Sequence, residues 1–455
     1  MLEKTPVTHP ESRLGRTAGT GFPVSTMLRD SLYDIVPLAD AELALIDAQA
    51  FLRLERVQQL GFVSRVWPGA RHTRFEHSIG VFHLARQAIE HLRARSDAQW
   101  ITDEDARTIC AAALLHDIGH YPFSHAIEEL GDPVISHEQV GRAIVLGDEI
   151  APILREHWGV DPKRVASIID PAGQQLHPAD TVLRGILSGP LDVDKLDYLP
   201  RDAHACSVPY GGVDTNRLIA SLIFATPPAE AKPRIAVDAK GVSPLHSLIN
   251  ARQEMFDNVY WHHTNRACMA MLLRAVQDAI FADAISATEL TDNDDASLLA
   301  LMIRFRMPET TRRLANALQR REIHKRAVEI GAQAADLYDR VGALFHNPAQ
   351  RRTVELGMTR RLETLLGESL PDETILIDIP KPERWRTDVW VWFDRPPVGF
   401  RRLMPWREVV GLGDDDFKRF EEHRRLVRII AAGPYRDAVR QHWEALLLPE
   451  LGGVI

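Results

Sequence analysis

The sequence predicts a mainly α-helical protein with a smaller α+β region at its C-terminal end. Apolar residues recur at helical spacing over most of residues 40–285. Short runs with the pattern of strands are recognised only after residue 370. Hydrophobic residues make up 45% and charged residues 26%, which is ordinary for a soluble globular protein. A length of 455 residues allows one large domain with an appendage, or two to three domains.

The helical part begins after an N-terminal segment, residues 1–25, that has no apolar stretch and predicts a flexible tail. One helix is predicted over residues 39–61 and another from Ile79. The acidic residues after Thr102 are a start signal for a helix that ends at Leu115. Further helical patterns occupy residues 123–131, 137–146, 162–169, 179–188, 213–224 and 243–283.

The C-terminal region differs in character. Residues 287–370 are helical in pattern but more charged, and residues 312–341 form one amphipathic stretch. Residues 374–380 and 387–393 predict two short strands, and residues 414–432 a last helix. We therefore expect a tail (1–25), a helical domain (26–285) and an α+β region (286–455) that completes the core and forms an oligomer interface.

Composition excludes several classes of protein. The formal charge is −9, which argues against a protein that coats nucleic acid, although residues 319–326 and 423–428 could form local basic patches. Three cysteines without a CxxC pair exclude a disulfide scaffold. Because the longest apolar runs are far shorter than the ~20 residues that cross a bilayer, we expect no membrane partner and a cytoplasmic location.

Histidine and aspartate are concentrated in four segments, residues 71–80, 114–129, 136–139 and 191–202, and eight of the 19 histidines lie between His72 and His137. Any single histidine is more often structural, but an adjacent His-Asp pair after an apolar helix would be costly to bury without a partner. Imidazole nitrogen and carboxylate oxygen together suit Fe, Mn, Zn or Mg. The candidate metal ligands are His77, His116, Asp117 and Asp194.

These segments resemble the HD-domain phosphohydrolase superfamily, whose H…HD…D signature matches the four candidate ligands. The strings PGARHTRFEHSIGV, HDIGHYPFSH, HEQ and DVDKLDYLPRD are similar, in this order, to the branch that contains the dNTP triphosphohydrolases. The resemblance covers about residues 45–275. It implies an HD-domain helical core, a divalent metal ion, and hydrolysis of a dNTP to deoxynucleoside and inorganic triphosphate.

The resemblance also implies roles for three more histidines. His120 and His137 would lie beside the substrate phosphates and transfer protons, and His125 would touch the α-phosphate. The neighbouring Glu138 could raise the basicity of His137. Without the resemblance, His137 also fits a residue that merely follows the helix cap at Ser136.

The substrate contacts implied by the resemblance are Gln59, Leu60, Arg74, Lys195, Tyr198, Asp202 and Arg266. Arg74, Lys195 and Arg266 supply positive charge for a polyphosphate. Asp202 would accept a hydrogen bond from the sugar 3′-hydroxyl, and Gln59 and Leu60 would contact the deoxyribose. On the residues alone, Lys195 and Asp202 also fit surface ion pairs, and residues 59–60 the end of an amphipathic helix.

The regulation of vertebrate-type members is not expected here. Those members read an activating guanine nucleotide with a glutamine and an arginine, where this chain has Leu52 and Glu55, although Asp47 is retained. A homo-oligomer, dimer or tetramer, is expected. Two alternatives stay open: another HD phosphohydrolase (a nucleotidase, or a phosphodiesterase or nuclease), and a non-catalytic nucleotide sensor.

Overall fold

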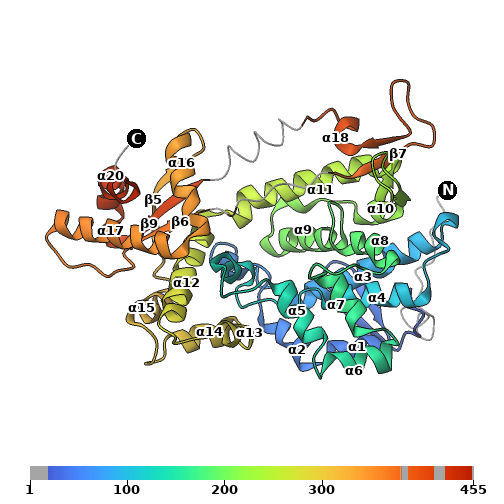
Figure 1. The fold of residues 1–455 in the computed structure, drawn as a ribbon, viewed down its shortest axis with the longest axis horizontal. Helices are drawn as coiled ribbons and strands as arrows, with labels where there is room; N and C mark the ends of the chain where they lie inside the picture. Colours follow the sequence, from blue (N-terminus) through green and yellow to red (C-terminus); the bar gives the residue numbers. More distant parts are fainter. Residues whose placement is uncertain (1–18, 380, 382–387, 414–425, 453–455) are drawn as a thin grey trace.

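The computed structural model describes residues 19–379, 381, 388–413 and 426–452. The fold is mainly α-helical with three small sheets, as the sequence predicts. Figure 1 shows a larger part that holds α1 to α11 and a smaller part that holds α12 to α17 and α20. No helix among the described residues is long and apolar enough to cross a membrane.

The N-terminal residues of the described chain pack against the larger part. Strands β1 (Thr26–Asp30) and β2 (Asp34–Leu38) form an antiparallel hairpin that the sequence did not predict. Within the expected tail, Thr20 is buried and its hydroxyl donates to Glu42 at 3.1 Å, and the Phe22 ring contacts Trp158 edge-on. Residues 1–18 lie outside the described residues.

The larger part is a helical core. Its helices are α1 (Asp40–Ile46), α2 (Gln49–Leu52), α3 (Arg74–Arg93), α4 (Asp103–Leu115), α5 (His137–Val145), α6 (Ile150–Ile153), α7 (Pro162–Ile169), α8 (Pro178–Leu187), α9 (Val193–Cys206), α10 (Thr215–Ala220) and α11 (Val242–Met255). The alanine-rich α4 is fully buried over residues 109–115 and packs against α3, α7 and α8. Its start is the capping box at Thr102 that the sequence indicates, with the hydroxyl accepting from the Asp105 amide at 3.1 Å.

Three predicted helices are interrupted. The helix expected over 39–61 is divided into α1, α2 and a 3₁₀ turn (Arg53–Arg56). It does not continue further, because Val57 and Gln59 pair through their backbones with residues 72–74. The prediction for 213–224 covers α10 but also strand β3 (Leu222–Ala225), which pairs with β4 (Arg234–Asp238). The expected helix over 243–283 is α11, a π-helical turn (Phe256–Tyr260) and α12 (His263–Phe281).

The smaller part surrounds α12. Its other helices are α13 (Ala287–Thr291), α14 (Asp295–Met302), α15 (Glu309–Arg320), α16 (Ala335–Gly342), α17 (Pro348–Leu366) and α20 (Arg436–Leu447). Helix α12 packs against α15 and against a sheet with the order β5 (Lys325–Ile330), β9 (Val427–Ala431), β6 (Ile375–Asp378). The two strands predicted near residues 374 and 387 are β6 and β7 (Trp390–Trp392).

Two helical predictions in this region are wrong in part, because each segment includes a strand, although the stretch 312–341 also covers most of α15 and α16. The amphipathic stretch 312–341 contains β5, and the last predicted helix ends in β9, whose five residues are all buried. An apolar run inside a sheet cannot be distinguished from a buried helix by periodicity alone. The start of that predicted helix, residues 414–425, lies outside the described residues. Strand β7 pairs in parallel with β4, and β8 (Leu403–Pro405) and α18 (Trp406–Val409) follow it onto the larger part.

Candidate metal and phosphate site

The four candidate metal ligands come together where three helix ends meet. His77 lies one turn into α3, His116 and Asp117 follow the last residue of α4, and Asp194 lies in the first turn of α9. His77 Nε2 is 3.1 Å from Asp194 Oδ1 and 3.6 Å from Asp117 Oδ2. His116 Nε2 is 3.3 Å from Asp117 Oδ1 and 3.7 Å from Asp194 Oδ1. His77, His116 and Asp194 therefore form a compact group that could hold a metal ion, and Asp117 lies next to both histidines of this group.

The orientation of both imidazoles fits a metal. His116 Nδ1 donates to the Ala113 carbonyl at 2.8 Å, which leaves the lone pair on Nε2. This Nε2 is buried and has no hydrogen-bond partner among the described residues. His77 Nδ1 donates to Asp197 Oδ2 at 2.8 Å, and such a carboxylate contact is what orients metal-binding histidines. Two imidazole nitrogens and two carboxylates suit a divalent ion without selecting one.

The charges at this cluster favour a bound cation. Burial opposes ionisation of Asp117, yet Arg74 and the neighbouring histidines hold the pKa of its carboxyl well below the usual value. Burial also opposes a charge on His77, but hydrogen bonds to Asp194 and Asp197 raise its pKa to about 10. The carboxylates therefore stay ionised and attract positive charge, which a metal ion can supply in place of the proton.

A glycine turn joins this cluster to a second group of histidines. A Cβ atom at Gly119 would lie 2.2 Å from the His137 carbonyl oxygen and 2.3 Å from the Gly141 nitrogen, so only glycine allows the turn to pack on α5. The turn places His120 against His137, with ring centroids 3.8 Å apart and an interplanar angle of 17°. His120 Nε2 also lies 3.2 Å from Asp117 Oδ1. Asp117 thus touches both groups.

Glu128, which the sequence analysis did not single out, organises the second group. Its Oε1 accepts from both the backbone nitrogen and Nδ1 of His137 at 2.6 Å, and its Oε2 accepts from His125 Nδ1 at 3.0 Å. Glu138, expected in this role, lies farther from His137 Nδ1, at 3.5 Å. The three-residue spacing from His125 to Glu128 was the available signal.

The stacked histidines differ in protonation. Burial, the Arg74 charge and His137 lower the pKa of His120 well below its usual value. Burial also opposes charge on His137, but the hydrogen bond that His137 donates to Glu128 raises the pKa of His137 overall. The surroundings therefore favour the neutral form of His120, whereas Glu128 favours the charged form of His137.

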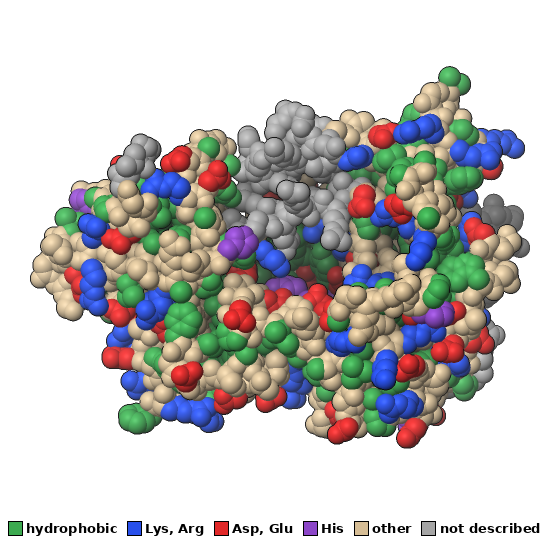
Figure 2. Space-filling model, in the orientation of Figure 1, with side chains coloured by type: hydrophobic (Ala, Val, Ile, Leu, Met, Phe, Trp, Pro, Cys, Tyr) green, Lys and Arg blue, Asp and Glu red, His purple; other side chains and the backbone are tan. Residues whose placement is uncertain are grey.

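A cavity of about 620 Å³ opens beside both groups. This volume suits a small-molecule ligand. Histidine and acidic side chains gather at the floor of the hollow between the two parts of the molecule (Figure 2). Of the residues predicted from the sequence, the cavity is lined by Gln59, Leu60, Arg74, His125, Asp194, Lys195, Tyr198, Asp202 and Arg266.

One wall of the cavity carries hydrogen-bonded polar groups. Asp202 accepts from the Tyr260 hydroxyl at 2.6 Å and its other oxygen contacts His72 Nε2 at 2.7 Å. Tyr260, from the π-helical turn after α11, was not predicted. Lys195 Nζ donates to Asp192 Oδ2 at 2.6 Å and to the Gly189 carbonyl at 3.0 Å. Both expected polar residues are thus held by neighbours in defined positions at the cavity.

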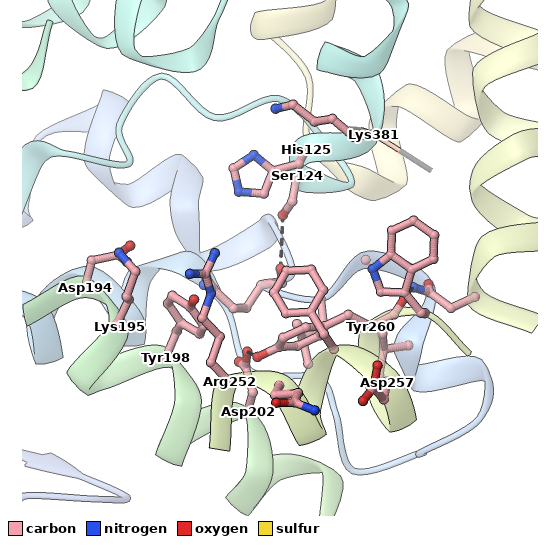
Figure 3. Close-up of a pocket in the computed structure, with 18 of the residues that line it drawn as sticks. Ser124, His125, Asp194, Lys195, Tyr198, Asp202, Arg252, Asp257, Tyr260 and Lys381 are labelled. Atoms are coloured by element: carbon pink, nitrogen blue, oxygen red, sulfur yellow. Dashed lines mark hydrogen bonds between the residues drawn. The ribbon is translucent and has the colours of Figure 1, made fainter. Parts of the chain in front are cut away.

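Arg252 of α11 and Arg266 of α12 both line the cavity. Arg266 donates to Asp378 at 2.6 and 2.9 Å and to Glu129 at 3.0 Å, so two carboxylates neutralise its charge. Arg252, which the sequence analysis missed, also lines the cavity and lies beside Tyr198 in Figure 3. Arg252 and Arg266 are thus both cationic residues of the cavity lining, and Arg266 also ties α12 to β6.

Comparisons with known proteins agree with this geometry. The pattern of the HD domain matches residues 74–184, and that of the HD-associated region matches residues 213–391. An uncharacterized protein of Methanocaldococcus jannaschii is 32% identical over 303 residues, 66% of this chain and 59% of that protein. The deoxynucleoside triphosphate triphosphohydrolase SAMHD1 of Homo sapiens is 28% identical over 282 residues, 55% of this chain and 44% of that protein.

Similarity extends to a solved structure. The crystal structure of a hypothetical protein from Aquifex aeolicus matches 92% of this chain and 99% of that chain, with a TM-score of 0.67 and 25% identity. The matches to the first curated relatives span only 51–59% of those proteins. The HD motif, the HD-associated region and the His/Asp cluster together show that the chain belongs to the HD-domain superfamily and is similar to its SAMHD1-like branch.

Proposed function

We propose that the chain is a metal-dependent dNTP triphosphohydrolase that releases deoxynucleoside and inorganic triphosphate. One observation carries the proposal. Asp117 contacts both the His/Asp cluster and the stacked pair of His120 and His137, and a cavity lined by several cationic side chains lies beside them. Two of the similar proteins, from Dictyostelium discoideum and Homo sapiens, are named deoxynucleoside triphosphate triphosphohydrolases.

The metal would be held by His77, His116, Asp117 and Asp194. A divalent ion there supplies Lewis-acid polarisation of a phosphoryl oxygen. Fe, Mn, Mg and Zn all suit this donor set. Asp197 and the Ala113 carbonyl keep the two imidazoles turned with Nε2 towards the cluster.

The second group of histidines would supply the proton to the leaving group. A triphosphate brings about four negative charges, and nearby negative charge raises the pKa of an imidazole, so substrate binding favours protonation of His120. His120 then holds the proton that the leaving 5′-oxygen requires. Glu128 keeps His137 charged beside it, and His125 contacts the α-phosphate.

The cavity wall would recognise the rest of the nucleotide. Arg74, Lys195 and Arg252 supply cations for the phosphates, while the ion-paired Arg266 supports the wall. The deoxyribose would be read by Gln59, Leu60, Tyr198 and Asp202. An apolar Leu60 against the 2′-carbon disfavours a ribonucleotide, whose 2′-hydroxyl would lack a partner.

We also propose a cytoplasmic homo-oligomer, dimer or tetramer, with an interface in residues 286–455 and no membrane partner. Guanine-nucleotide activation of the vertebrate kind is not part of the proposal, because Glu55 stands exposed where an arginine would be needed. Nucleic acid is not the main partner.

The proposal is tested by incubating the protein, loaded in turn with Mn²⁺, Fe²⁺, Mg²⁺ or Zn²⁺, with single dNTPs and with a dNTP mixture. ³¹P NMR separates triphosphate from pyrophosphate and phosphate. We expect triphosphate, its loss in His116→Ala, and full activity in the control His204→Ala, which changes an exposed histidine of α9.

Two other outcomes would replace the proposal. Hydrolysis of monophosphates, cyclic nucleotides or nucleic-acid ends without any triphosphate would favour a different HD phosphohydrolase. Saturable dNTP binding without turnover under every metal would favour a nucleotide sensor.

A further inference from the structure

The turn between His120 and His125 has an unusual backbone. Phe123 and Ser124 are consecutive non-glycine residues with left-handed φ angles of 58° and 60°. Each such residue costs on the order of 1 kcal/mol, and the conformation persists only where the surroundings hold it. The turn carries His125 and follows His120 directly, so whatever holds it also positions these side chains.

The turn is held by a carboxylate from the HD-associated region. Asp295, the first residue of α14, is only 8% exposed. Its Oδ1 accepts from the Phe123 backbone nitrogen at 2.7 Å, and its Oδ2 accepts from the Gln58 backbone nitrogen at 3.1 Å. The Ser124 hydroxyl in turn donates to the Gln58 carbonyl at 2.9 Å. One side chain thus joins the turn to the segment that carries Gln59 and Leu60.

The His120 end of the turn is also linked to the start of α14. Arg53 Nη2 donates to the His120 carbonyl at 2.6 Å, and Arg53 Nη1 donates to the Asn293 carbonyl at 2.9 Å. The start of α14 is therefore linked to both ends of the segment from His120 to Phe123.

We propose that Asp295 is a positioning residue that holds the strained turn, and with it His120 and His125, in the geometry required for turnover. The link to turnover rests on the proposed function, whereas the link to the turn does not. Asp295 is neither one of the four candidate metal ligands nor one of the residues that line the cavity. It acts through the backbone of Gln58 and of Phe123, and Phe123 does line the cavity.

The two acceptor oxygens of Asp295 can be removed one at a time by substitution. A carboxylate offers an acceptor oxygen to each of the two backbone donors. In Asp295→Asn one oxygen becomes an NH₂ group that faces an N–H, so one of the two bonds is lost although the shape is kept. Asp295→Ala loses both. The adjacent Asp294 is a matched control, because its side chain caps α14 and pairs with Arg56 instead, and Asp294→Asn retains an N-cap residue.

The test combines local hydrogen exchange with kinetics. In Asp295→Asn and Asp295→Ala we expect faster amide exchange confined to peptides covering 56–60 and 118–126, kcat lower by about 10- to 100-fold, KM changed less than threefold, and unchanged bound metal. Asp294→Asn should match the wild type.

Unchanged exchange in both Asp295 variants would overturn the proposal. So would an increase spread over the whole molecule, because that describes general destabilisation. If the wild-type protein hydrolyses no dNTP, the proposed function fails, while the exchange data still decide whether Asp295 holds the turn.

Discussion

Replacing Glu128 by Gln tests the proton-handling group directly. The substitution keeps the size of the side chain and one acceptor oxygen, so the bond from the His137 backbone nitrogen can persist. It removes the negative charge that contacts Nδ1 of both His137 and His125. The pKa of His137 should therefore fall, since Glu128 is what raises it against burial.

The expected loss of stability can be estimated from these contacts. The Glu128 and His137 side chains are 14% and 12% exposed, so their charge-assisted bond is little screened and is worth about 1.5–3 kcal/mol. His125 is 61% exposed, and its bond adds little. We expect Glu128→Gln to lower the free energy of unfolding by about 2 kcal/mol near pH 6.

The pH dependence of this loss has a defined sign. The folded protein raises the pKa of His137 above 6.5, so this contribution is complete below pH 6.5 and disappears as the pH rises through the raised value. Glu128 has a lowered pKa, so its contribution is present above its ordinary value of 4.5 and is lost in acid. The difference between wild type and variant should be largest between about pH 5 and 6.5.

Urea unfolding at several pH values measures the change in the free energy of unfolding. The pH profile of kcat measures the effect of the substitution on catalysis. His120, the proposed acid, is retained in this variant, so kcat should fall by less than the about 10²- to 10⁴-fold that general acid catalysis contributes. A pH-independent stability difference, or a kcat within a few-fold of wild type, would refute the assignment of His137 as the charged member of the pair.

Three further outcomes follow from the same contacts. Asp197→Asn should weaken metal binding by about 10- to 100-fold, measured by chelator competition, because His77 loses the carboxylate that orients it. Arg266→Ala should lower the free energy of unfolding by about 3–5 kcal/mol in urea titrations, since Asp378 and Glu129 are left buried without their cation. Metal removal should abolish activity and lower the melting temperature, and metal added at 100 times its Kd should restore about 2.7 kcal/mol of stability. Unchanged metal affinity in Asp197→Asn, unchanged stability in Arg266→Ala, or an unchanged melting temperature after metal removal would contradict the role given to that contact.

Much of the candidate site was predictable because its residues lie in short motifs with strong local rules. His116 and Asp117 follow a buried helix that must end at Gly119, and the structure shows the close contact that requires glycine there. His77 and Asp194 come from other helices, and they were joined to this pair by their donor chemistry together with the resemblance to a known family.

One of the residues that were missed acts across a long sequence distance. Asp295 is 172 residues from Phe123, and no local pattern distinguishes it from an ordinary first-turn carboxylate. The same limit affected the fold, because β5 and β9 pair with each other across about 100 residues while their apolar spacing alone resembles helix. Tertiary pairing overrode local preference in both cases.

The central claim concerns which bond breaks, and isotope incorporation tests it most directly. A dNTP hydrolysed in H₂¹⁸O by the metal-loaded protein should give triphosphate that contains one ¹⁸O atom and a deoxynucleoside that contains none, as read by mass spectrometry. This result means that water attacks the α-phosphorus and the 5′-oxygen leaves. Recovery of ¹⁸O in free phosphate or in a nucleoside monophosphate would contradict the account.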